Sequence, residues 1–148
     1  MYKILDNSYL NLIFRLFLGG FFIVAGIAKI ADPTHFSKEI INYNITPISI
    51  VNIIALFLPW LELIVGVLLA FGIKIKTNSI IIGVLLLIFI LMVFSAMARG
   101  LNISCGCFGK ASEQKTGWGK VFENLGLMIL CIYLYFSNPE KFTFVEKY

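Results

Sequence analysis

Charged residues are scarce in this chain. Its 148 residues include twelve Lys or Arg and eight Asp or Glu, which is 14%, whereas soluble proteins have about 25%. So few charges cannot cover the surface of a soluble domain, which excludes a soluble enzyme and a disordered tail. The basic residues are spread along the sequence without the cluster that nucleic acid requires, so no nucleic-acid partner is expected. With 59% apolar residues and a mean hydropathy of +0.93, the composition predicts an integral membrane protein whose first partner is the lipid bilayer.

Four apolar runs are long enough to cross the bilayer, which takes about 20 residues in a helix. They cover approximately residues 9–30, 48–73, 79–98 and 118–137. No segment alternates apolar and polar residues as the strands of a membrane barrel do, and helices satisfy their own backbone hydrogen bonds in lipid. The sequence therefore predicts an all-α protein, a four-helix transmembrane bundle that occupies residues 1–148 as a single domain.

Basic residues near the spans indicate an orientation. Four spans place both termini on one side, together with the short connection that carries Lys74 and Lys76, the densest positive loop. The positive-inside rule then favours cytoplasmic termini in a multi-pass protein of the inner membrane, with the loop after the third span outside. The first span is longer than a signal-peptide core and contains Arg15, so we expect it to be retained.

Arg15 and Glu62 are ionisable residues inside predicted spans. An Arg at the centre of a spanning helix costs about 2.5–3.5 kcal/mol on insertion scales, so such residues normally face the bundle and find partners. At about 1.5 Å per residue, Arg15 and Glu62 lie roughly 9 and 16 Å from the same surface. We therefore predict a buried Arg15–Glu62 pair, which is either a structural ion pair or the polar centre of a quinone, substrate or proton path.

Proline and small residues modify the first two spans. Pro59 precedes Glu62 by three residues and is expected to kink the helix, widening the space around Trp60 and Glu62. Small residues at close spacing predict a close approach between the two helices. They are Gly19, Gly20, Ala25 and Gly26 in the first span, and Gly66 and Ala70 in the second.

Two thiols follow the third span in the segment Cys105-Gly106-Cys107. A disulfide across so short a spacing needs a bent backbone, which Gly106 permits. The small ring would be strained and easily reduced, and it would add little stability, which favours thiol–disulfide exchange. Lys110, and Arg99 if the loop folds back, would favour the thiolate.

Other roles for the cysteine pair stay open. The two thiols can be inert in a tight turn, or they can bind copper(I) as two thiolates. A zinc site needs four ligands, and the remaining soft donors are His35, which is more simply a solvated loop residue, and Cys131. We expect Cys131 to be a buried small hydrophobe about 15 Å from the loop, so no zinc site is predicted and no residue is assigned as a metal ligand.

These motifs resemble those of the MauE/DoxX-type membrane proteins, and of the MauE branch most closely. The resemblance covers roughly residues 10–135, and one departure from the family pattern is Glu123-Asn124, where we expect a basic residue early in the last helix. The features that carry the resemblance are Arg15, Gly19, Phe22, Gly26 and Lys29 in the first span; Phe36, Tyr43 and Pro47 in the connection; Pro59-Trp60-Leu61-Glu62 and Gly66 in the second span; and Arg99-Gly100 with Cys105-Gly106-Cys107-Phe108-Gly109 in the loop.

The resemblance implies a redox-associated membrane protein. MauE proteins are linked to the maturation of methylamine dehydrogenase in methylamine metabolism and act beside a thioredoxin-like partner, whereas DoxX proteins are linked to quinone-coupled sulfur oxidation. We therefore predict a thiol–disulfide oxidoreductase in which Cys105 and Cys107 react with an extracytoplasmic thioredoxin-like protein, with quinone as the candidate cofactor. The alternative is a non-catalytic subunit or assembly factor of a larger membrane complex. A transporter is less favoured, because no inverted repeat is evident.

Overall fold

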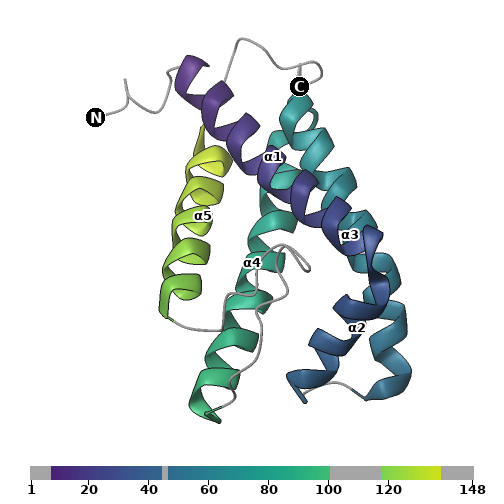
Figure 1. Cartoon of the computed structure of the whole chain (residues 1–148). Helices are drawn as coiled ribbons and strands as arrows, with labels where there is room; N and C mark the ends of the chain where they lie inside the picture. The colour runs from purple at the N-terminus through teal and green to yellow at the C-terminus, as the bar shows by residue number, and fades with distance from the viewer. Residues whose placement is uncertain (1–7, 45–46, 101–117, 138–148) are drawn as a thin grey trace.

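The computed structural model describes residues 8–44, 47–100 and 118–137, and these form five helices (Figure 1). Four of them are long and apolar enough to cross a membrane, which confirms the prediction of an all-α integral membrane protein with four spanning helices. The helices are α1 (Ser8–Ala31), α2 (Pro33–Asn42), α3 (Ile48–Phe71), α4 (Ile75–Ala98) and α5 (Trp118–Phe136).

A tight turn joins α3 to α4. Gly72 ends α3 in the left-handed conformation, with φ +76°. Its backbone N–H donates to the carbonyl oxygens of Leu68 and Leu69. Glycine adopts this conformation without the steric cost that a Cβ imposes. α4 therefore begins at Ile75, four residues earlier than the run predicted from the sequence, and Lys76 belongs to the helix.

Glycines let α1 and α3 cross in close contact (Figure 1). A Cβ on Gly19 would lie 2.7 Å from the carbonyl oxygen of Gly66, and one on Gly26 would lie 2.9 Å from that of Pro59. Both distances are shorter than real Cβ contacts, so these positions require glycine. A Cβ on Gly20 would meet no atom of the described residues within 4 Å, so Gly20 does not take part in the predicted close approach.

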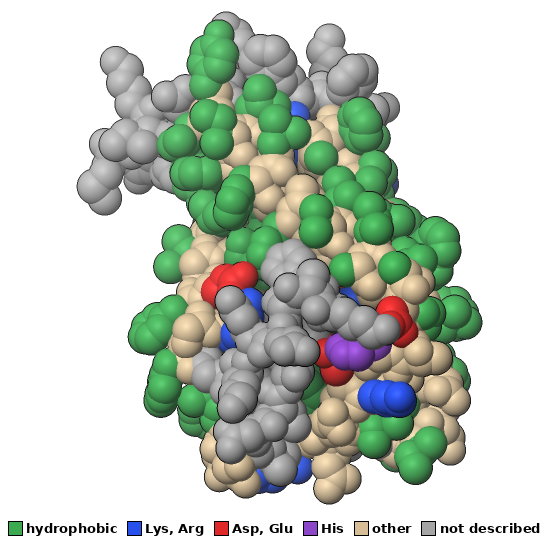
Figure 2. Space-filling view, viewed as in Figure 1, with side chains coloured by type: hydrophobic (Ala, Val, Ile, Leu, Met, Phe, Trp, Pro, Cys, Tyr) green, Lys and Arg blue, Asp and Glu red, His purple; other side chains and the backbone are tan. Residues whose placement is uncertain are grey.

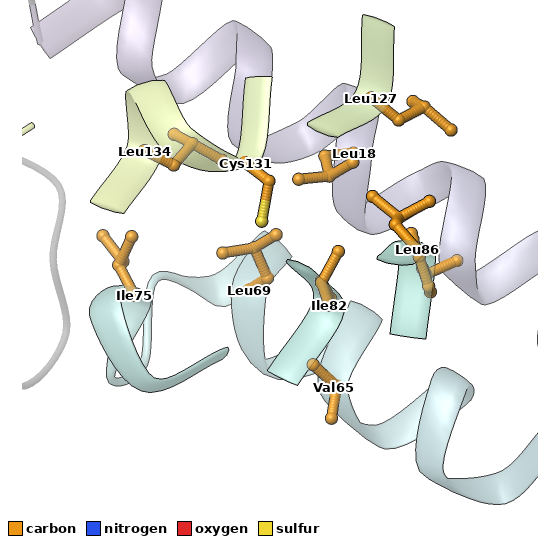
Figure 3. Packing of buried hydrophobic residues seen from close by; sticks show 10 residues of the cluster. Leu18, Val65, Leu69, Ile75, Ile82, Leu86, Leu127, Cys131 and Leu134 are labelled. Carbon is orange, nitrogen blue, oxygen red and sulfur yellow. The ribbon is translucent and has the colours of Figure 1, made fainter. Parts of the chain in front are cut away.

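Buried apolar side chains from α1, α3, α4 and α5 form the main core (Figure 3). Cys131 lies among them, 3% exposed, and its thiol donates a hydrogen bond of 2.7 Å to the carbonyl oxygen of Ser79. Cys131 is thus the buried thiol expected from the sequence. The cluster consists of Leu18, Phe22, Val65, Leu69, Ile75, Ile82, Leu86, Leu127, Cys131 and Leu134.

The short helix α2 was missed in the sequence analysis, which treated residues 31–47 as a connection. Asp32 caps it, because its Oδ1 accepts hydrogen bonds from the backbone N–H of His35 and the hydroxyl of Thr34. Pro33 occupies the first turn, where its missing N–H costs nothing. The sequence Asp-Pro is a recognised start signal for a helix, and it could have revealed α2.

Candidate functional site

α2 continues the wall of the bundle beyond the end of α1. Its apolar face, Phe36 and Ile40, is buried against Val51 and Ala55 in the first half of α3. The charged and polar residues of α2 divide between this inner side, where Glu39 is buried, and an outer side, where Lys38 is exposed. α2 therefore carries one carboxyl group into the interior of the protein.

A buried ion pair joins α1 to α3 where α1 ends. The ammonium group of Lys29 donates to both carboxylate oxygens of Glu62 at 2.7 Å each, and the residues are 6% and 7% exposed. The same ammonium group lies 5.0 Å from the centre of the Phe36 ring, within the range of a cation–π interaction. Lys29, near the end of α1, thus contacts both α3 and α2.

The predicted Arg15–Glu62 pair was wrong, although both residues are buried as expected. The depth argument placed the start of α1 and the end of α3 at the same surface, whereas α1 begins beyond the end of α3, because Arg15 lies opposite Gly72. The guanidinium of Arg15 lies against Gly72, since a Cβ there would be 2.5 Å from its Nη1. Gly72 is roughly 15 Å beyond Glu62 along the chain direction of α3, at about 1.5 Å per residue.

A cavity of about 450 Å³ opens beside the Lys29–Glu62 pair, between all five helices. Its walls are mostly apolar, with aromatic rings from Phe21, Phe22, Phe36 and Phe89. Its polar groups come from Lys29, Glu39, Tyr43, Glu62 and Asn124. A largely apolar cavity of this size with a few converging polar groups has the character of a small-molecule site.

Glu39 is a buried carboxyl group on the α2 side of the cavity. It is 5% exposed, and neither of its carboxylate oxygens accepts a hydrogen bond within the described part of the chain. Burial raises the pKa of Glu39, while the charges of His35 and Lys29 act in the opposite direction. Nδ1 of His35 lies 3.4 Å from Oε1 of Glu39, and the His35 side chain is 32% exposed. Figure 2 shows this imidazole, in purple, at the surface, so only His35 separates Glu39 from the surface on this side.

Trp60 does not line the cavity and is 51% exposed. The expectation that Pro59 would widen a space around both Trp60 and Glu62 was therefore wrong for Trp60. Two residues apart on a helix, they are separated by about 200° of rotation and cannot face the same side. Pro59 is buried against Gly26, while Trp60 points to the outside.

Arg99 fastens α4 to the end of α2. Its guanidinium donates to the carbonyl oxygens of Tyr43 at 2.6 Å and Asn44 at 3.5 Å. Arg99 begins the segment that carries Cys105, Gly106 and Cys107, which lie outside the described residues. The bond from Arg99 to Tyr43 places the end of α4 at the α2 end of the bundle, and Figure 1 shows α5 beginning toward the same end.

The first turn of α5 contributes a buried cation that sequence reasoning did not select. Lys120 is 5% exposed, and its Nζ lies 2.8 Å from Oε2 of Glu123. Asn124, on the cavity wall, donates to the backbone carbonyl of Lys120 at 2.7 Å. The sequence did offer a signal for this buried cation, because Lys120 lies one helical turn before the polar Asn124 within the predicted fourth span.

The family model for the methylamine utilisation protein MauE matches residues 7–137. The chain belongs to the MauE family. It is 29% identical over 119 residues to MauE of Paracoccus denitrificans and 30% identical over 126 residues to MauE of Methylorubrum extorquens. These alignments cover 80% and 84% of this chain, and 64% and 68% of those proteins.

A third relative is considerably longer. Protein TlpB of Flavobacterium psychrophilum is 27% identical over 141 residues, which is 88% of this chain and 37% of TlpB. This chain thus spans about two thirds of the MauE proteins and about a third of TlpB. No solved structure matches it.

Proposed function

We propose that this MauE-family protein is a thiol–disulfide oxidoreductase of the membrane. The observation that carries the proposal is the thiol pair Cys105 and Cys107, separated by Gly106, in the segment that follows Arg99. So small a disulfide ring is readily opened and re-formed, which suits exchange better than it suits stabilisation. Arg99, which precedes this segment, donates to the carbonyl oxygen of Tyr43, a residue that lines the cavity.

The exchange partner is a thioredoxin-like protein on the extracytoplasmic side. A thiolate of the partner attacks the Cys105–Cys107 disulfide and forms a mixed disulfide, which the partner's second thiol resolves. The partner leaves oxidised, and Cys105 and Cys107 hold the two electrons as thiols. Disulfides persist on that side of the inner membrane, so we place the cysteine segment there and the termini in the cytoplasm, in agreement with Lys74 and Lys76.

The pathway proposed is the one in the family description. Members are described as methylamine utilisation proteins, and we propose that this chain serves methylamine metabolism by supporting the maturation of a disulfide-containing protein. The exchange chemistry does not depend on that assignment, because it requires the thiol pair and a partner with an accessible dithiol.

Thiol trapping in intact cells tests the proposal. The background variant is Cys131→Ser, which removes the buried thiol and keeps a donor for the Ser79 carbonyl oxygen. A membrane-impermeant maleimide should then label Cys105 and Cys107 after mild reduction and much less before it. Labelling that is unchanged by reductant would overturn the redox role, and labelling that needs cell lysis would overturn the orientation.

The cysteine variants separate catalysis from an accessory role. Cys105→Ser should trap a mixed disulfide with the partner through Cys107, or Cys107→Ser through Cys105, visible as a reducible band of higher mass. Loss of pathway activity in both variants is the expected result. Full activity of the double variant, together with a partner that co-purifies in equal amount, would instead identify a non-catalytic subunit or assembly factor.

A further inference from the structure

We propose that the cavity between the five helices binds a quinone, and that Glu39 delivers protons to it. This inference rests on the proposed function, since a dithiol that is oxidised in the membrane needs a lipid-soluble acceptor for two electrons. The site itself consists of described residues and is argued from their positions.

The walls favour a flat, apolar molecule that arrives from lipid. Four phenylalanines face the cavity, from α1, α2 and α4, and aromatic rings stack favourably on a planar ring. The volume of about 450 Å³ lies within the range of sites for small organic ligands and is far larger than a water or an ion needs. Four of the five surrounding helices are long and apolar enough to span a membrane, so a ligand that partitions into the bilayer can reach the cavity.

The polar groups favour a ligand with carbonyl oxygens. Two N–H groups of Lys29 bond to Glu62, which within the described residues leaves the third of the ammonium's donors for an acceptor on the ligand. Glu39 lies on the α2 wall of the same cavity, and burial favours its protonated form. A protonated carboxyl group donates a hydrogen bond, so the cavity offers a donor on two of its walls, as the two carbonyls of a quinone require.

Glu39 also has a route to water through His35. The 3.4 Å between Nδ1 of His35 and Oε1 of Glu39 places a partly exposed titratable group behind the buried one. The reaction then balances. Cys105 and Cys107 lose two electrons to the quinone and two protons to water and form a disulfide. The quinone gains the two electrons, and Glu39, reprotonated twice through His35, supplies two protons to give the quinol.

Equilibrium binding of decylubiquinone to the full chain in lipid nanodiscs, with empty nanodiscs subtracted, tests the site. Leu58→Trp fills the cavity, whereas Leu61→Trp makes the same change on the outer face of α3, where Leu61 is exposed. We expect saturable binding that Leu58→Trp weakens at least about tenfold and Leu61→Trp alters less than about twofold. Equal binding by the two variants, or no saturable binding by the wild type, would overturn the site.

A second variant tests the role of Glu39. Glu39→Gln keeps a hydrogen-bond donor but cannot release a proton, so decylubiquinone should still bind while its reduction by the reduced protein slows about 100-fold. Unchanged reduction in Glu39→Gln would remove Glu39 from the mechanism.

Different results would refute the quinone site and the proposed function. Cys105→Ser/Cys107→Ser should bind decylubiquinone normally and transfer no electrons. Disulfide exchange with a thioredoxin-like protein but no quinone binding would refute the cavity inference alone. Quinone binding without thiol exchange would refute the proposed function alone.

Discussion

Lys29 and Glu62 form a buried bidentate ion pair, with both oxygens of the carboxylate 2.7 Å from one ammonium group. The pair joins the end of α1 to the middle of α3, next to the cavity. Charges that are buried in this way are costly when separated, because the remaining partner stays in a medium of low dielectric constant. The pair therefore holds the two helices in one register.

Removing one partner should destabilise the protein strongly. We expect Lys29→Met to lower the free energy of unfolding by about 3–5 kcal/mol, whereas Lys29→Met/Glu62→Met should recover most of that loss. Unfolding in mixed micelles measures both, and Lys76→Met, at an exposed position of α4, is the control. Equal losses in the single and double variants would show that the pair does not act as a unit.

The glycines of α1 give a matched pair of substitutions. Gly19→Ala places a methyl group 2.7 Å from the Gly66 carbonyl oxygen, while Gly20→Ala meets no described atom within 4 Å. We expect Gly19→Ala to cost about 1–3 kcal/mol by overpacking and Gly20→Ala to be neutral or slightly stabilising, because alanine is the better helix former. Thermal unfolding in detergent compares the two. A similar loss for both would refute the close contact between α1 and α3.

Much of the fold could be predicted from the sequence, because the bilayer imposes a simple rule on length and hydropathy. The runs that begin near Tyr9 and Ile48 correspond to α1 and α3. The pairing between helices was less predictable. Arg15 and Glu62 are both buried as expected, but the stagger of α1 against α3 depends on contacts such as Gly19 with Gly66 and cannot be derived from depth alone.

The candidate site was partly predictable for a similar reason. Glu62 stood out because a carboxylate inside an apolar run needs a partner. Lys29 was selected through the family resemblance and not as that partner, because it lies at the end of its run. Glu39 was missed entirely, since its burial depends on α2, and a short polar helix between two spans is overshadowed by the apolar signal around it.

The conformation of Gly72 leads to a third prediction. Gly72 and Gly100 both have positive φ, +76° and +68°, but only at Gly72 would a Cβ approach a described side chain, the guanidinium of Arg15 at 2.5 Å. Alanine should cost about 1–2 kcal/mol at either position from backbone strain, and more at Gly72 because Arg15 must move. The difference between the two unfolding free energies measures the Arg15 contact, and no difference would exclude it.

Glu39 should make stability depend on pH. Because burial raises its pKa above the ordinary value of 4.5, the folded state binds this proton more tightly than the unfolded chain does. Its stabilising contribution is complete below pH 4.5 and is lost as the pH rises through the folded-state pKa. Denaturant unfolding at a series of pH values should therefore show stability falling with pH in this window, with a shallower fall in Glu39→Gln. Identical slopes for the two proteins would contradict a protonated Glu39.

The bonds of Arg99 should control how firmly α2 closes the cavity. Arg99→Lys replaces a planar group that reaches the carbonyl oxygens of both Tyr43 and Asn44 with an ammonium group on a flexible stem, which lacks the planar fork and should weaken these bonds. Losing about 1 kcal/mol of local stability should speed amide hydrogen exchange at the end of α2 roughly fivefold. Amides of α1 around Gly19, far from this bond, serve as the internal control. Faster exchange throughout the protein would instead mean that Arg99 supports the whole bundle, and unchanged exchange in α2 would mean that its packing on Val51 and Ala55 suffices to hold it.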